Sequence, residues 1–177
     1  MFYFVRHGQT DYSQKGETVY QGWGVQMSPL SQKGVEQIER AAKDERLRGA
    51  ELILTSPYTR AVQTAAILSR ETGARIVVET DLHEWLANKA YAYDDDETAA
   101  QSYREYVEYG GAYPEGGERC WEDATSIRTR VLAVLEKYRQ CDKVIIASHG
   151  MLMRAMTGKP DDGRLWPENG EIVAFEG

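Results

Sequence analysis

The fold is decided by two stretches, Phe2-Tyr-Phe-Val-Arg-His-Gly8 and Val144-Ile-Ile-Ala-Ser-His-Gly150. In each stretch, a short run of apolar and β-branched residues is followed by a histidine and a glycine. Such a run is typical of a buried strand, and a glycine straight after it predicts a turn from strand to loop. Because ligands bind at the carboxyl edge of open α/β sheets, we expect His7 and His149 to share one pocket there.

Strand and helix patterns alternate along the rest of the chain. After a polar loop over residues 9–30, Ser31 predicts a helix N-cap, and apolar residues recur at helical spacing through Leu47 before Gly49. Ser56 and Pro57 are expected to begin the next helix as its N-cap and first residue. Further strands are expected at 51–55, 75–79, 144–148 and 171–175, and further helices at 98–109, 121–139 and 151–156. This order predicts one α/β domain over residues 1–177 with a mostly parallel sheet.

Residues 85–118 interrupt the alternation, and we interpret them as a small cap inserted into the domain. They are rich in tyrosine and include the acidic run Asp94–Glu97. The acidic run suits the N-terminus of a short helix, where the helix dipole favours negative charge. A metal site is less favoured, because four adjacent carboxylates on one turn cannot all face one ion. The tyrosines either pack the cap onto the body or line a substrate entrance.

Composition and charge exclude several classes of function. The net charge of −7 opposes broad binding to nucleic acid or to an anionic membrane surface, so we expect neither partner. No stretch approaches the roughly 20 apolar residues of a membrane helix, and strand-like residues begin at Phe2 without a signal-peptide pattern. We therefore expect a cytoplasmic protein with Cys120 and Cys141 as reduced thiols. The sequence does not fix the oligomeric state, and a homodimer is one option.

The ends of the predicted strands bring a distinctive set of side chains to one edge. Arginine presents a planar fork of donors that suits phosphate oxygens, and glycines let backbone amides approach an anion closely. The helix start near Ser56 adds its dipole. The set consists of Arg6-His7-Gly8, Arg60, His83-Glu84 and His149-Gly150. These residues predict a phosphate pocket.

The same residues suit phosphoryl transfer. Attack by one neutral histidine on phosphorus gives a phosphohistidine, while arginines and the second histidine stabilise the charge on the other oxygens. Glu84 is the carboxylate near this edge that can give the leaving group a proton and then accept one from water. Glu118 and Glu122 are alternative proton donors, because preceding glycines let their loop reach the site. His83 is more typical of a structural or substrate-rim histidine.

Five segments, in order, resemble the histidine phosphatase superfamily, in its branch of phosphoglycerate-mutase-like enzymes. They are Phe4-Val-Arg-His-Gly-Gln-Thr10, Pro29-Leu-Ser-Gln-Lys-Gly34, Ser56-Pro-Tyr-Thr-Arg-Ala61, Leu82-His-Glu84 and Ser148-His-Gly150. The resemblance spans essentially the whole chain and implies a three-layer α/β/α sandwich that needs no metal or other cofactor. By position, His7 resembles the phosphorylated nucleophile and Glu84 the proton donor. Arg6, Arg60 and His149 resemble the phosphate ligands.

Three departures from the family pattern concern substrate binding. Gln9 and Ser13 stand where members often have glutamate and asparagine, so a hydroxyl is expected to replace the amide contact near the phosphate. Met27 replaces an aspartate, so the substrate loop around Gly22 is expected to be held differently. Gly116-Gly-Glu-Arg119 departs from Pro-x-Gly-Glu-Ser and leaves the role of Arg119 open. The expected substrate contacts outside the catalytic group are Gly8, Ser13, Gly22 and Gly150.

Together these features predict a metal-independent phosphomonoesterase that acts through a phosphohistidine on a small phosphorylated metabolite. One alternative is a phosphoglycerate mutase, which the resemblance disfavours because the family's bisphosphoglycerate-dependent mutases are longer. Another is a non-catalytic module that binds a phosphorylated ligand, although binding alone needs neither a nucleophile nor an acid. Sugar phosphates, nucleotide monophosphates, a cofactor-pathway phosphate such as α-ribazole phosphate, and phosphoproteins all remain open as substrates.

Overall fold

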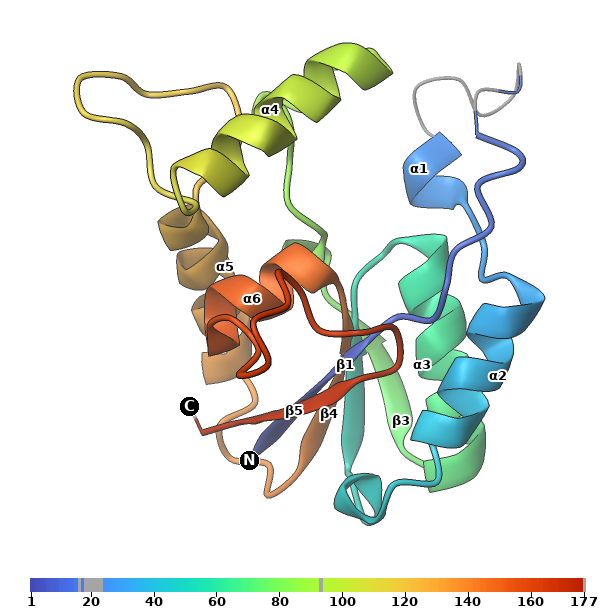
Figure 1. Ribbon diagram of the computed structural model, residues 1–177. Coiled ribbons are helices and arrows are strands. Elements are labelled where there is room, and N and C mark those ends of the chain that lie inside the picture. The colour runs from blue at the N-terminus through green and yellow to red at the C-terminus, as the bar shows by residue number, and fades with distance from the viewer. Residues whose placement is uncertain (16, 18–23, 93, 177) are drawn as a thin grey trace.

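The computed structural model describes residues 1–15, 17, 24–92 and 94–176. In this part of the chain, one sheet has the strand order β3-β2-β4-β1-β5 (Figure 1). Its strands are β1 (Phe2–Arg6), β2 (Leu52–Thr55), β3 (Arg75–Val78), β4 (Val144–Ser148) and β5 (Ile172–Phe175). The helices are α1 (Gly24–Met27), α2 (Gln32–Ala41), α3 (Thr59–Thr72), α4 (Asp96–Glu108), α5 (Ala124–Glu136) and α6 (Gly150–Thr157), with 3-10 turns η1 (Glu45–Leu47) and η2 (Thr80–Leu82).

The register of the sheet positions the site. Strands β1 to β4 are mutually parallel through their pairings, and only β5 is antiparallel, to β1. Arg6 pairs with Ser148, so the residues that follow them, His7 and His149, leave the same edge side by side. Thr55 pairs with Ala147, which brings the β2–α3 connection to that edge as well. The predicted mostly parallel sheet is confirmed.

Helices cover both faces of the sheet (Figure 1). On one face, α5 and α6 pack against Phe4, Leu54 and Ile146, and on the other, α2 and α3 pack against Ile53 and Ile145. All of these strand side chains are fully buried. Burial on both faces explains why β1, β2 and β4 are apolar without alternation, as is usual for parallel strands. The arrangement is the three-layer α/β/α sandwich that the resemblance implied.

The helix after Ser31 is shorter than its apolar pattern predicts. Ser31 does cap α2, since its Oγ accepts the Gly34 N–H at 3.0 Å. The α-helix ends at Ala41, however, and Leu47 is buried from the separate turn η1. Asp44 starts that turn by accepting the Arg46 N–H at 2.9 Å. Its side chain competes with helix propagation, as short polar side chains often do.

Two predictions near the site were wrong in detail. The interval 9–30 is not loop throughout, because it contains α1. Helix α3 begins at Thr59 rather than at Pro57, and its N-cap Tyr58 makes no side-chain capping bond. Ser56 Oγ instead accepts the Tyr58 N–H at 3.3 Å, ahead of the helix. The first amides of α3 therefore lie further along the chain than the serine and proline suggested.

The predicted cap contains α4, which stands above α5 and α6 (Figure 1). Asp95 Oδ1 caps it by accepting the Thr98 N–H at 2.7 Å, so the acidic run lies at a helix start as predicted, two residues earlier. Tyr106 is buried against Trp121 and Met151, with Tyr103 and Tyr113 beside them. These tyrosines pack the cap onto the body. Helix α5 covers a narrower interval than predicted because Asp123 caps it and it ends at Glu136.

Candidate active site

The imidazoles of His7 and His149 meet at the carboxyl edge of the sheet, with ring centroids 5.2 Å apart. Both side chains are buried. The contact follows directly from the register of β1 and β4, since each histidine comes one residue after a paired strand residue. Two histidines far apart in sequence thus share one site, as the strand pattern predicts.

Hydrogen bonds fix the tautomer of His7. Its Nδ1 lies 2.7 Å from the carbonyl oxygen of Gly8, which can only accept, so Nδ1 carries the proton. Its Nε2 faces the Nε–H of Arg60 at 3.2 Å and is therefore the acceptor. Burial and the charges of Arg60 and Arg6 lower the pKa of His7 to about 3. The ring is neutral near pH 7 with a lone pair on Nε2, which is the form a nucleophile requires.

Arg60 links three parts of the site. It is 3% exposed on the first turn of α3, and its Nη1 donates to the carbonyl of Val25 in α1 at 2.7 Å. Its guanidinium also lies over the ring of Tyr58, 5.0 Å from the centroid. Together with the bond to His7, these contacts hold a buried cation within reach of the histidine pair.

Arg6 approaches the site from the end of β1. Its Nη1 donates to the carbonyl of Pro167, while its buried Nε has no partner among the described residues. A Cβ on Gly150 would lie 3.3 Å from this guanidinium, so the glycine leaves the room that Arg6 occupies. Burial lowers the pKa of Arg6, and the charge of Glu84 partly opposes that shift. A buried arginine N–H without a partner among the described residues suits an anionic ligand.

His149 is fully buried, and neither of its ring nitrogens has a hydrogen-bond partner in the described part of the chain. Buried polar groups are normally paired, so two unpaired nitrogens in one ring indicate a place for a ligand. Burial and the charge of Arg60 lower the pKa of His149 well below its usual value. The edge of the ring also meets Tyr58, with centroids 5.4 Å apart.

Glu84 lies at the N-terminus of α6. Its Oε1 accepts the N–H groups of Trp85 and Leu152 at 2.9 and 3.1 Å, and its Oε2 accepts the N–H of Met151 at 3.2 Å. A carboxylate oxygen has two lone-pair directions, so Oε1 is filled by donors of the described residues, and Oε2 keeps one position free of them. Sequence reasoning placed Glu84 at this edge but missed its contact with α6, which joins residues 67 positions apart.

The predicted glycine and serine contacts divide into three cases. Gly8 is required by packing, because a Cβ there would lie 2.3 Å from the carbonyl oxygen of Gly34. Ser13 is exposed, and its N–H donates to Asp11 Oδ1 at 2.9 Å. No hydrogen bond within the described residues joins Ser13 to the histidines or arginines of the site. Gly22 lies outside the described residues.

The alternative acids are both engaged elsewhere. Glu118 is exposed and pairs with Lys89. Both oxygens of Glu122 accept from Arg130, at 2.7 and 3.0 Å. His83 is buried and its Nδ1 donates to the carbonyl of Glu84 at 2.7 Å, a structural arrangement. These contacts leave Glu84 as the carboxylate best placed to serve the histidine pair.

Three other side chains that the sequence singled out are Arg119 and the two cysteines. Arg119, whose role was open, forms an ion pair with Glu105 at 3.4 Å. Cys120 and Cys141 are free thiols.

Over the described ranges, no group of three or more His, Cys, Asp or Glu side chains is placed to hold a metal ion. None of the helices there has the length and apolarity required to span a bilayer.

Two residues that sequence reasoning missed complete the site. Asn169 Nδ2 donates to the backbone carbonyl of His7 at 2.8 Å and so fixes the turn after β1. Asn169 belongs to no element that the sequence pattern predicts. Tyr58 contacts both Arg60 and His149, but its place in the serine-proline segment gave no signal of that contact.

Comparison with known proteins identifies the family. The model of the histidine phosphatase superfamily, branch 1, matches residues 2–162, and the chain therefore belongs to this superfamily. Among curated proteins, the probable phosphoglycerate mutase GpmB of Escherichia coli O1:K1 is 28% identical over 159 residues, which cover 85% of this chain and 70% of that protein.

Solved structures share the fold. A mycobacterial glucosyl-3-phosphoglycerate phosphatase in complex with inorganic phosphate superposes with a TM-score of 0.68 at 20% identity, covering 97% of this chain and 86% of that one. YhfR of Bacillus stearothermophilus gives a TM-score of 0.66 at 23% identity, covering 99% and 91%. At these identities the likeness establishes the fold alone.

Proposed function

We propose that this protein hydrolyses phosphomonoesters of small metabolites through a phosphohistidine on His7. The observation that carries the proposal is the state of His7, a buried neutral imidazole whose Nε2 lone pair faces Arg60. Its ring contacts His149, whose nitrogens have no hydrogen-bond partner among the described residues. Such an arrangement presents a nucleophile and anion ligands at one point. Membership of the superfamily supports the same function.

The reaction has two balanced steps. In the first, His7 Nε2 attacks phosphorus, the bond from phosphorus to the ester oxygen breaks, and Glu84, which starts this step protonated on Oε2, gives that oxygen its proton. In the second, water attacks the phosphohistidine, Glu84 takes a proton from it, and inorganic phosphate leaves with His7 restored. Arg6, Arg60 and His149 bind the remaining phosphoryl oxygens, where charge stabilisation provides most of the catalysis.

Glu84 suits this role through its free position on Oε2. The N–H groups of Trp85, Met151 and Leu152 orient the carboxylate at the same edge as the histidine pair. A fixed orientation matters because proton transfer requires the acid to lie within hydrogen-bond reach of the leaving oxygen.

A mutase is the second candidate, because the curated relative is named a probable phosphoglycerate mutase. A mutase returns the phosphoryl group of the phosphohistidine to an alcohol, whereas a phosphatase transfers it to water. The names of the relatives share a phosphoglycerate unit, so a substrate panel begins with phosphoglycerates and glycosylated phosphoglycerates. Interconversion faster than phosphate release identifies a mutase, and the reverse ratio supports the proposal.

The test is phosphate release from an aryl phosphate and from the metabolite panel between about pH 5 and pH 8. We expect His7→Ala to lower kcat by about 1,000-fold or more and to abolish the phosphohistidine, trapped under alkaline conditions because this adduct is acid-labile. Thermal melting verifies that the variant is folded. Wild-type protein without activity, or a His7→Ala variant as active as wild type, contradicts the proposal.

A further inference from the structure

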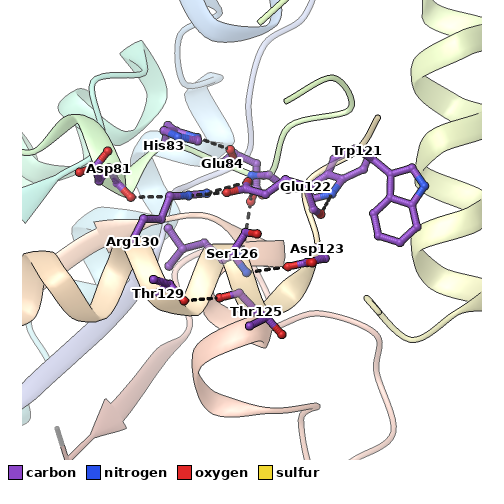
Figure 2. A network of polar contacts seen from close by, with 12 residues as sticks. Asp81, His83, Glu84, Trp121, Glu122, Asp123, Thr125, Ser126, Thr129 and Arg130 are labelled. Carbon is purple, nitrogen blue, oxygen red and sulfur yellow. Dashed lines mark hydrogen bonds and ion pairs between the residues drawn. The ribbon is translucent and has the colours of Figure 1, made fainter. Parts of the chain in front are cut away.

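The segment that carries Glu84 has little regular structure of its own. After η2 ends at Leu82, residues 83–86 run as irregular chain. Neither a strand partner nor a helix therefore fixes the position of the Glu84 backbone. Besides the local bond from His83 Nδ1 to the Glu84 carbonyl, the segment is held from outside by Glu122 and Arg130, which lie 37 and 49 positions beyond the residues they bind (Figure 2).

Glu122 and Arg130 form a largely buried, bidentate ion pair. Nε and Nη2 of Arg130 donate to the two carboxylate oxygens of Glu122 at 2.7 and 3.0 Å. Their side chains are only 13% and 7% exposed, for Arg130 and Glu122 respectively. The remaining arm of the guanidinium, Nη1, donates to the carbonyl of Asp81 in η2. Arg130 on α5 is thus tied to the chain three residues before Glu84.

The backbone of Glu122 holds the other side of the segment. Its N–H donates to the carbonyl of Leu86 at 2.9 Å, two residues after Glu84. Its carbonyl accepts the indole N–H of Trp85 at 2.7 Å. The chain is therefore held on both sides of Glu84, at Asp81 by the Arg130 side chain and at Trp85 and Leu86 by the Glu122 backbone.

Helix α5 also holds α6, the helix that binds the Glu84 carboxylate. Arg128, two residues before Arg130, donates through Nη1 to the carbonyls of Ala155 and Met156 at 2.8 and 3.1 Å. These carbonyls lie near the end of α6, the helix whose first amides bind the Glu84 carboxylate. One helix thus places both the segment that carries the carboxylate and the helix that receives it.

A buried ion pair is a costly way to stabilise a fold. Removing two charges from water offsets much of their attraction, and apolar replacements of similar size are often as stable or more so. What the pair supplies is geometry, since the planar guanidinium binds both oxygens of Glu122 in one orientation and leaves its third arm for Asp81. That geometry fixes the segment on which Glu84 is carried.

We propose that Glu122 and Arg130 are positioning residues for Glu84, holding its carboxylate at the orientation in which it protonates the leaving group. This inference rests on the proposed function, because it assigns the proton donor of that reaction a support. Neither residue contacts substrate, and their effect passes through the 81–86 segment.

The test compares two substrates that differ in their need for an acid. An alkyl phosphate has a poor leaving group and needs protonation, whereas p-nitrophenyl phosphate has a good one and needs little. We expect Glu122→Gln and Arg130→Lys each to lower kcat/KM for the alkyl phosphate about tenfold or more, because small displacements of a catalytic group are costly. For p-nitrophenyl phosphate we expect less than about a twofold change in kcat/KM, which reports formation of the phosphohistidine and leaves out its hydrolysis, a step common to both substrates. Arg130→Lys keeps the positive charge, so it separates geometry from electrostatics.

The matched control is Asp44→Asn. Asp44 also binds an arginine through two oxygens, from Arg46 Nε and Nη2 at 2.9 and 2.8 Å, but at η1 and away from the 81–86 segment. We expect this variant to change both activities less than about twofold. Where a single variant melts below the assay temperature, the double variant Glu122→Met with Arg130→Met replaces it, because removing both charges avoids an unpaired one. It is expected to show the same selective loss.

Equal losses of kcat/KM on the two substrates indicate a purely structural role and overturn the proposal, as does an unchanged kcat/KM for the alkyl phosphate. These results differ from a failure of the proposed function. If wild-type protein forms no phosphohistidine on His7, the reaction itself is misassigned. If wild-type protein forms it and hydrolyses both substrates, only the positioning role is at stake.

Discussion

The proposed phosphate end of the site, around His7 and His149, and its proposed proton-donor side, around Glu84, are built in different ways. His7 and His149 each follow a strand residue that is paired with the other strand, so the sheet register alone brings them together. Glu84 instead follows a 3-10 turn and depends on side chains and amides from α5 and α6. The comparison teaches that regular backbone pairing fixes the proposed nucleophile, whereas specific tertiary contacts fix the proposed acid.

The largest effect is expected from Arg60→Lys, which tests the phosphate end. Lysine cannot donate to both His7 and Val25 through a planar fork, so the cation no longer lies fixed beside the nucleophile. We expect kcat/KM to fall about 100-fold or more, measured with p-nitrophenyl phosphate.

Arg70→Lys is the matched control for that change. Arg70 lies on the same helix but pairs with Glu39 on the surface, so its replacement should alter kcat/KM less than about twofold. Equal effects of the two variants contradict a special role for Arg60.

A somewhat smaller effect is expected from Gly8→Ala. The new Cβ would lie 2.3 Å from the carbonyl oxygen of Gly34, and two backbone segments would have to separate. We expect the free energy of unfolding to fall by about 2–3 kcal/mol, measured by urea denaturation.

Gly116→Ala makes the same change on the cap side. A Cβ at Gly116 would meet nothing within 4 Å among the described residues, and only the φ of +82° opposes a side chain there. We therefore expect a cost of about 1 kcal/mol. A cost at Gly8 no larger than the cost at Gly116 would show that the turn after β1 is less tightly packed than the structure indicates.

The next effect in size is a loss of folding stability in acid, caused by His7 at the proposed phosphate end. Burial lowers the pKa of His7 from 6.5 to about 3, so between these values the unfolded chain binds more protons than the folded one. Stability therefore falls as pH decreases below 6.5, by about 2 kcal/mol between pH 7 and pH 5 for His7 alone. Urea denaturation in phosphate-free buffer measures the effect.

His7→Gln is the control for this pH dependence, because glutamine does not titrate. The variant should lose much of the slope between about pH 7 and pH 5, and His149, whose pKa is also lowered, should account for much of the remainder. Asp44 does not interfere, since its pKa is lowered to about 2 and its contribution is lost only below its usual value of 3.8. Identical slopes in wild type and His7→Gln refute the assignment.

The smallest effect is expected where the loop after β1 meets the cap. Lys15 and Asp96 pair at 2.8 Å, but Asp96 is 80% exposed, so solvent screens the interaction. Asp96→Asn should change the free energy of unfolding by less than about 0.5 kcal/mol, and added salt should reduce the difference further. A larger change, measured by urea denaturation at low salt, would mean that the cap is held to the body more firmly than its surface contact suggests.

Local signals predicted much of the fold. Ser31 caps α2 as its residue type indicates, and Gly73 ends α3 in the left-handed conformation that glycine favours. Helix α1 escaped notice because four residues are too few to show helical periodicity. The end of α2 was wrong because Asp44 starts a new turn while the apolar spacing continues to Leu47.

The part of the site that depends on strand and helix ends was also predictable. Arg6, His7, Arg60 and His149 could be placed at one edge because each lies at the end of a strand or begins the helix after one. The bonding partners of three residues could not be predicted, namely those of Glu84, Glu122 and Asn169. Bonds between distant side chains and backbone leave no periodic pattern in the sequence. The tyrosines of the cap were ambiguous for the same reason, until Tyr106 was found packed on Trp121.

The sequence by itself determined the sheet, the edge at which its histidines emerge and the arginines beside them. It did so because strand and helix periodicity, caps and turns act over a few residues, and parallel pairing then aligns the strand ends. Only the tertiary structure decided how the proton-donor side is assembled. There, contacts between Glu84 and α6 and between Arg130 and Asp81 join positions 67 and 49 residues apart, and packing rather than local pattern selects them.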